Sequence, residues 1–113
     1  MGFFSFTKAD RILKRSEFIH LSKTGKKLQN RHFIVTFSPG QFQRSRLGVT
    51  VTKKVGSSVK RNRIKRLSRE YFRLNRHHLK GNWDINIIAK KEANGLESDP
   101  FFASLDYLFR KIS

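Results

Sequence analysis

The stretch RLGVTVTKKVGSSVKRNRIKR, residues 46–66, decides the fold of this chain. Its first part alternates apolar and polar side chains, which predicts a strand over residues 46–53. The Gly-Ser-Ser segment 56–58 ends that strand, and a long helix is expected from about Val59 to Leu79. Apolar side chains recur in this helix at spacings of three and four and form one stripe for packing on a sheet: Ile64, Leu67, Tyr71, Leu74 and His78.

The opposite side of the same helix is basic. Between residues 44 and 76 the chain carries twelve Lys and Arg but only one acid, Glu70. Unpaired like charges on one helix face are destabilising in isolation, which favours a polyanionic partner over a merely solvated face. One guanidinium group can donate two parallel hydrogen bonds to a phosphate, so the expected partner is nucleic acid. The side chains expected on this face are Arg61, Lys65, Arg66, Arg69, Arg73 and Arg76. Phe72 also lies on this side, where it either covers the N-terminal arm or stacks on RNA.

The residues before this stretch predict an extended arm over 1–15, a short helix over 17–23 capped by Ser16, and a short edge strand over 26–30. Phe33, Val35 and Phe37 alternate with His32, Ile34 and Thr36 in a period of two and predict a further strand over 31–38. Pro39-Gly40 predicts a turn, so strands 31–38 and 46–53 are expected to form a hairpin.

The last third of the chain completes a single domain, expected over residues 1–113. The Ile-rich segment 83–90 predicts a buried strand that needs cover on both faces. Asp99-Pro100 predicts the start of a last helix, whose inner side chains are Phe101, Leu105, Leu108 and Ile112. The order α-β-β-β-α-β-α indicates an α+β fold, a small α/β sandwich.

Composition narrows the function further. The chain has 113 residues, a net charge of +17 and no cysteine, which excludes disulfides, thiol catalysis and metal sites built on Cys. Apolar runs stay well short of the roughly 20 residues that span a bilayer, so we expect a soluble, cytoplasmic protein without a membrane partner. The eight acids and four His lack the clusters that two-metal nuclease sites need, so we expect neither catalytic nor metal-binding residues in the protein.

The segments RLGVTVTKK (46–54) and VKRNRIKR (59–66) resemble the bacterial ribonuclease P protein subunit. The resemblance extends to Arg11-Ile12-Leu13, Phe18, Gly25 and the closing Leu-Phe-Arg-Lys (108–111), so it covers nearly the whole chain. It implies a fold like the second domain of ribosomal protein S5, with a left-handed crossover around the basic helix. It also implies that a catalytic RNA partner cleaves the 5′ leader from precursor tRNA and that the holoenzyme requires Mg²⁺, in a ribonucleoprotein expected to be 1:1.

The resemblance also implies two RNA-binding surfaces. The catalytic RNA is expected to meet Lys53, Lys54, Lys60, Arg61, Asn62, Arg63, Lys65, Arg66 and Arg69. The single-stranded leader is expected in a cleft between the first helix and the sheet, where Phe18 either stacks on a base or is a core residue. Ser22 and Thr36 stand where some relatives carry aromatic residues, so stacking is weaker here or comes from Phe33 or the arm. The alternative function is that of a structural RNA-binding protein of the ribosomal type, which composition alone does not separate from this one.

Overall fold

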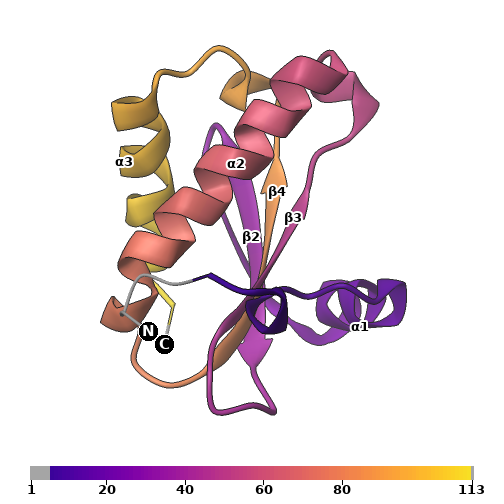
Figure 1. The fold of residues 1–113 in the computed structure, drawn as a ribbon, viewed down its shortest axis with the longest axis vertical. Helices are drawn as coiled ribbons and strands as arrows, with labels where there is room; N and C mark the ends of the chain where they lie inside the picture. Colours follow the sequence, from indigo (N-terminus) through magenta and orange to yellow (C-terminus); the bar gives the residue numbers. More distant parts are fainter. Residues whose placement is uncertain (1–5, 113) are drawn as a thin grey trace.

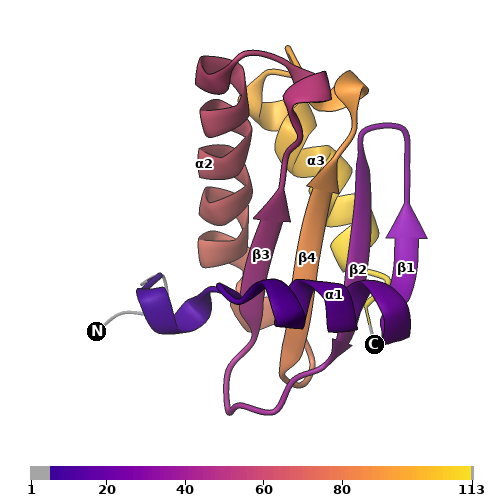
Figure 2. The same cartoon turned by 90° about the vertical axis from the view of Figure 1, so that its right-hand side faces the viewer.

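The structure of the chain is a computed structural model that describes residues 6–112. The regular elements are α1 (Arg15–Thr24), β1 (Lys26–Gln29), β2 (Phe33–Pro39), β3 (Arg46–Thr50), α2 (Ser58–Asn75), β4 (Trp83–Ala89) and α3 (Ser98–Phe109). Short 3₁₀ turns lie at Lys8–Asp10, Lys53–Val55, Arg76–His78 and Lys91–Ala93. The strands form one mixed sheet in the order β1-β2-β4-β3. Helices α2 and α3 cover one face and α1 crosses the other (Figures 1 and 2), which confirms the predicted α+β sandwich.

Strand β4 lies in the middle of the sheet, although it is the last strand in the sequence. It pairs antiparallel with β2 and parallel with β3, so the predicted hairpin between residues 31–38 and 46–53 is wrong. The Pro39-Gly40 turn signal marks the end of β2 but carries no information about which strand pairs with it. The Ile-rich β4 is buried best between two neighbours, and that requirement separates β2 from β3.

The connection from β3 through α2 to β4 is left-handed. In Figure 2 both strands point upward, α2 lies behind the sheet, and the chain passes from β3 on the left to β4 on the right. Parallel crossovers are right-handed in almost all proteins, so this connection is the exception that the resemblance implied.

The core lies between the sheet and helices α2 and α3. Phe33, Val35 and Phe37 all point into it, as their alternation predicted. From the helices come Ile64, Leu67, Tyr71 and Phe72 of α2, and Phe101, Leu105 and Leu108 of α3; Ile112 follows α3 and is also buried. Burying side chains of this size is worth about 1.5–3 kcal/mol each, which makes this layer the main source of stability.

Several element ends differ from the predictions. Helix α1 begins after Lys14 rather than at a Ser16 cap, and α3 begins after Glu97, two residues before Asp99. Helix α2 ends at Asn75, so His78 lies beyond it and is exposed. Phe72 is fully buried instead and packs edge-on against Phe6 of the arm, which answers the question of whether it covers the arm or faces RNA.

An ion-pair cluster joins α1 to both strands at one end of the sheet. Arg46 on β3 donates two hydrogen bonds to the carboxylate of Asp84 on β4, at 3.0 and 2.9 Å, and a third to Glu17 of α1 at 2.7 Å. The hydrogen bonds to Asp84 raise the pKa of Arg46, and the hydrogen bond from Arg46 lowers the pKa of Glu17. Because bidentate pairs have a fixed geometry, this cluster fixes the register of β3 on β4 and the place of α1.

A second cluster, around Asp10, fixes the N-terminal arm. Asp10 is 1% exposed and accepts hydrogen bonds from the Thr7 backbone N–H at 2.7 Å and from Arg44 at 3.0 Å. Arg76, just beyond α2, lies 2.7 Å from the same carboxylate. Burial opposes ionisation of Asp10, but the hydrogen bonds from Thr7, Arg76 and Arg44 outweigh burial and lower its pKa. Asp10 therefore ties the arm, the β2–β3 loop and the end of α2 together.

Helix α1 meets the sheet at a glycine. The ring of Phe18 lies directly over Gly48 of β3, where a Cβ would come within 2.3 Å of Phe18 Cε1 and 2.7 Å of Cζ. This close approach requires glycine for steric reasons, because the backbone there is ordinary strand. No helix within residues 6–112 is long and apolar enough to cross a membrane.

Asp10→Asn should lower the free energy of unfolding by about 2–4 kcal/mol at neutral pH, because it leaves two guanidinium groups with a neutral partner. Folding lowers the pKa of Asp10 below its unfolded value of about 3.9, so the native stabilisation is complete above that pH and is lost as the pH falls. The difference between D10N and the native chain in urea unfolding should therefore shrink below about pH 4. Glu92→Gln, the same charge change at an exposed site, is the control, and an equal loss in both variants would contradict the cluster.

Gly48→Ala should lower the free energy of unfolding by about 1–3 kcal/mol, because the new methyl group overlaps the Phe18 ring. In the background of Phe18→Ala the same substitution should have little effect, since the ring is gone. A double-mutant cycle measured by urea unfolding tests this coupling, and additive effects would show that Phe18 does not rest on Gly48.

Candidate RNA interface

The interface begins at the loop that leads into α2. Ser57 caps the helix by accepting a hydrogen bond from the Lys60 backbone N–H. Arg61 donates from Nε to the Gly56 carbonyl at 3.2 Å, and Asn94 donates to the Val55 carbonyl at 3.1 Å. These bonds hold the start of α2 in place, so its first N–H groups form a fixed positive end suited to a phosphate.

Lys53 and Lys54 lie in the 3₁₀ turn before this loop and not at the end of the preceding strand, because β3 already stops at Thr50. Both side chains are exposed. They therefore extend the positive surface from the start of α2 toward the end of β3, although the turn rather than the strand places them there.

The predicted basic residues of α2 do not share one flat face. Lys60, Asn62 and Arg66 are exposed, whereas Arg61, Arg63, Lys65 and Arg69 are half-buried. At 100° per residue, Asn62, Arg66 and Arg69 lie together opposite the apolar stripe. Arg63 lies on the side turned to α3, beside Glu97, Ser98 and Asp99.

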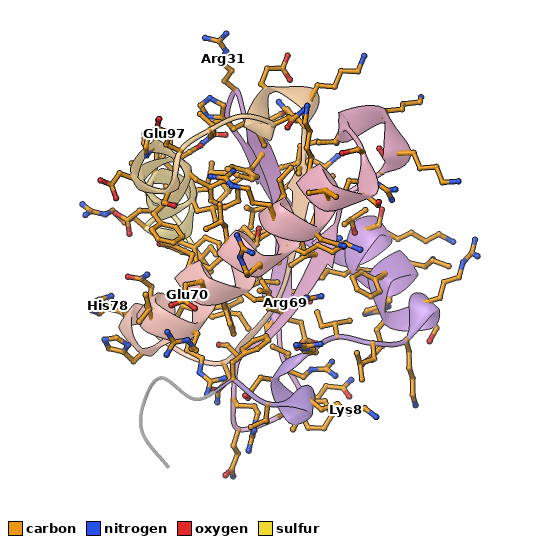
Figure 3. All side chains as sticks on the ribbon, turned by 45° about the horizontal axis from the view of Figure 1, so that its top comes forward. Lys8, Arg31, Arg69, Glu70, His78 and Glu97 are labelled. Carbon is orange, nitrogen blue, oxygen red and sulfur yellow. The ribbon has the colours of Figure 1, made fainter. Side chains whose placement is uncertain are left out.

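Charge on this surface is not neutralised locally. The ion pairs found within residues 6–112 involve Arg44, Arg46, Arg73, Arg76 and Arg110, and none of them involves a side chain between Lys53 and Arg69. Burial, and then the positive charge of Arg11, lower the pKa of Arg69. Figure 3 shows Arg69 on the part of α2 that faces the N-terminal arm, where Lys8 lies. The start and outer side of α2 therefore form a surface of unpaired cations that extends toward the arm.

The four predicted leader-binding residues do not come together. Phe18 and Thr36 lie between α1 and the sheet, where Phe18 is half-buried and Thr36 is 3% exposed, with a hydroxyl that has no hydrogen-bond partner in the described chain. Ser22 is exposed on α1. Phe33 is fully buried on the opposite face of the sheet, where its ring centroid lies 4.9 Å from that of Phe101. The suggestion that Phe33 stacks on the leader is therefore wrong.

The structure adds residues that the sequence did not indicate. Asn86 of β4 lies in the same row as Gly48 and Thr36, and it accepts a hydrogen bond from Thr50 at 3.3 Å. A polar residue within an Ile-rich strand was the available signal, but it needed the strand order to become meaningful. Arg11 of the arm was also missed, because its closeness to Arg69 depends on how the arm packs.

Across residues 6–112, no group of three or more His, Asp or Glu side chains lies close enough to hold a metal ion. The rings of His77 and His78 lie beyond the end of α2, with centroids 4.1 Å apart and planes tilted by 49°.

Comparisons with known proteins agree on one family. Residues 6–113 match the family model for ribonuclease P. The chain is 58% identical over 113 residues to the ribonuclease P protein component of Desulfatibacillum aliphaticivorans, covering all of this chain and 96% of that one. Among solved structures it is similar to the Staphylococcus aureus RNase P protein, with a TM-score of 0.85, 35% identity and coverage of 91% and 94%. The Thermotoga maritima RNase P protein gives a TM-score of 0.84, 33% identity and coverage of 91% and 97%. The resemblance found in the sequence is thus confirmed over nearly its whole length: the chain belongs to the ribonuclease P protein family.

Proposed function

We propose that this chain binds the catalytic RNA of ribonuclease P through the start and outer side of α2 and assists it in removing the 5′ leader from precursor tRNA. The observation that carries the proposal is the unpaired basic surface from Lys53 to Arg69, fixed on a folded core by a capped helix start. Family membership favours this role over that of a structural RNA-binding protein of the ribosomal type.

The chemistry belongs to the RNA in this proposal. The protein supplies cations that neutralise phosphates of the folded RNA, which lowers the demand for Mg²⁺ in the holoenzyme. A complex of one protein with one RNA in the cytoplasm is the arrangement we propose. We propose that the RNA also binds the Mg²⁺ that the holoenzyme requires.

The leader is proposed to run along the face of the sheet that α1 partly covers. Phe18 is the aromatic side chain on that face, beside Gly48, Thr36 and Asn86. Stacking of one base on an aromatic ring is worth about 1–3 kcal/mol and tolerates any base, which suits an enzyme with many tRNA substrates. Because Phe33 points into the core, this face offers fewer aromatic side chains than the sequence suggested.

The direct test is cleavage of precursor tRNA by a bacterial ribonuclease P RNA, with and without this chain, over a range of Mg²⁺ concentrations. Addition of the chain should restore cleavage at low Mg²⁺, where the RNA alone is slow. The absence of stimulation at every Mg²⁺ concentration would exclude the proposed function. A heat-denatured sample of the same chain controls for the effect of its charge alone.

A mutational test uses Arg66, which is exposed and has no partner in the described structure. Arg66→Ala should weaken binding to the catalytic RNA and reduce the slope of log K against log salt concentration by about one, for one lost phosphate contact. The melting temperature should change little. Arg31→Ala removes the same charge from the β1–β2 turn, far along the molecule from Arg69 in Figure 3, and should leave the slope unchanged. Equal slopes for the two variants would place the RNA elsewhere.

A further inference from the structure

A hollow of about 250 Å³ lies between the N-terminal arm and the outer side of α2, and we name it the arm hollow. Two residues come from the arm and four from the helix: Phe6, Arg11, Arg66, Arg69, Glu70 and Arg73. The hollow therefore contains four guanidinium groups and one carboxylate. Figure 3 labels two of the helix residues that line it, Arg69 and Glu70 of α2.

The arm holds Arg11 firmly beside α2. The preceding residue, Asp10, is fixed by Arg44 and Arg76, and the following residue, Ile12, donates its backbone N–H to the Leu47 carbonyl at 2.9 Å. With both neighbours anchored, Arg11 is held at the helix by the fold itself. Its guanidinium lies 5.4 Å from the centroid of the Phe6 ring.

One donor of Arg11 is buried without a hydrogen-bond partner. Its Nε is shielded from solvent, and no acceptor in the described chain reaches it. A buried donor left unsatisfied costs about 1–3 kcal/mol, and more when the group is charged. The contact with Phe6 compensates part of the charge but does not accept the N–H in the plane of the guanidinium.

The helix side of the hollow adds further positive charge. Arg66, Arg69 and Arg73 are three and four residues apart and therefore lie on one side of α2. Burial and the charge of Arg11 both disfavour the charged form of Arg69. The only carboxylate, Glu70, is already paired with Arg73, so it does not neutralise Arg11 or Arg69.

Like charges at close range and an unsatisfied buried donor both lower the stability of the unliganded protein. Local features that lower stability in this way concentrate at functional sites. A bound ligand can remove the cost by neutralising the charges and accepting the free hydrogen bond. The ligand that does so here must be anionic and must accept several hydrogen bonds from guanidinium groups. A phosphate group meets both requirements, because its oxygens match the paired donors of arginine.

We propose that the arm hollow is a phosphate-binding site in which Arg11 of the arm and Arg69 of α2 bind one phosphodiester of the structured RNA. The assignment to RNA rests on the proposed function, whereas the affinity for phosphate does not. The N-terminal arm is then part of the RNA interface, and the bound phosphate joins it to the helix. Glu70 limits the affinity by placing one carboxylate at the rim.

The first experiment measures the melting temperature in inorganic phosphate against chloride at equal ionic strength. Phosphate should raise the melting temperature of the native chain, and Arg11→Met, which keeps the apolar stem, should lose most of that rise. Arg15→Met, the same change at an exposed position of α1, should keep it. Glu70→Gln should increase it. An unchanged rise in Arg11→Met would overturn the proposal.

Arg69→Met keeps the experiment decisive if Arg11→Met does not fold. In phosphate-free buffer this variant should melt no lower than the native chain, because it removes a charge that Arg11 repels. It should also gain less from phosphate. A residue with a purely structural role would lower the melting temperature in both buffers equally, and that result would contradict the site.

The second experiment separates RNA phosphate from free phosphate. Arg11→Met should bind a bacterial ribonuclease P RNA about three- to tenfold more weakly than Arg15→Met, with a salt slope lower by about one. If the phosphate response depends on Arg11 but RNA affinity does not, the hollow takes free phosphate and its assignment to RNA is wrong. If the native chain binds phosphate through Arg11 yet never stimulates the RNA, the proposed function fails and the phosphate site stands.

Discussion

The burial of strand β4 is the constraint on which the rest of the structure depends. Its Ile85 and Ile87 are completely buried under α2 and α3, and it hydrogen-bonds to a strand on each side. Because β4 follows α2 in the sequence and β3 precedes it, the central place of β4 forces α2 to lie across the sheet between them. The apolar stripe of α2 then packs on the sheet, so the basic side of the same helix faces the solvent. The exposed basic surface is thus a consequence of how the core closes.

Four of the eight acids of the chain have a structural use that complements this surface. Asp10 holds the arm, Glu17 and Asp84 hold Arg46, and Asp106 accepts hydrogen bonds from Tyr71 and Arg110. Each of these carboxylates joins elements that are distant in sequence or stabilises a helix end. These four acids therefore pair with arginines at positions that connect or stabilise elements of the fold: Arg44, Arg46, Arg76 and Arg110. The cations of the first turns of α2 are left for a partner, which is how a chain with a net charge of +17 combines a stable core with an unpaired basic face.

Local patterns predicted the elements but not their neighbours. The spacing of Ile64, Leu67 and Tyr71 and the alternation of Phe33, Val35 and Phe37 correctly predicted which side chains are buried, because periodicity reports directly on one face of an element. The hairpin failed, since a turn signal does not specify which strand pairs next. The same lack of information explains why Phe33 was considered for the leader cleft. Without the sheet order, the sequence does not show which face of the strand α1 covers and which face lies in the core. The basic surface was predicted from charge alone, whereas the contribution of Arg11 needed the packed arm.

Both edges of the sheet carry features that disfavour the addition of further strands. The four-residue β1 carries Lys26 and Lys27, and charged side chains on so short an edge disfavour pairing with another chain. At the other edge the arm covers part of β3, through one bridge between Arg11 and Leu47. An open edge would let copies of this protein add to one another by β-sheet extension. The same short segment of the arm therefore both places Arg11 beside α2 and covers part of the β3 edge, which disfavours such extension.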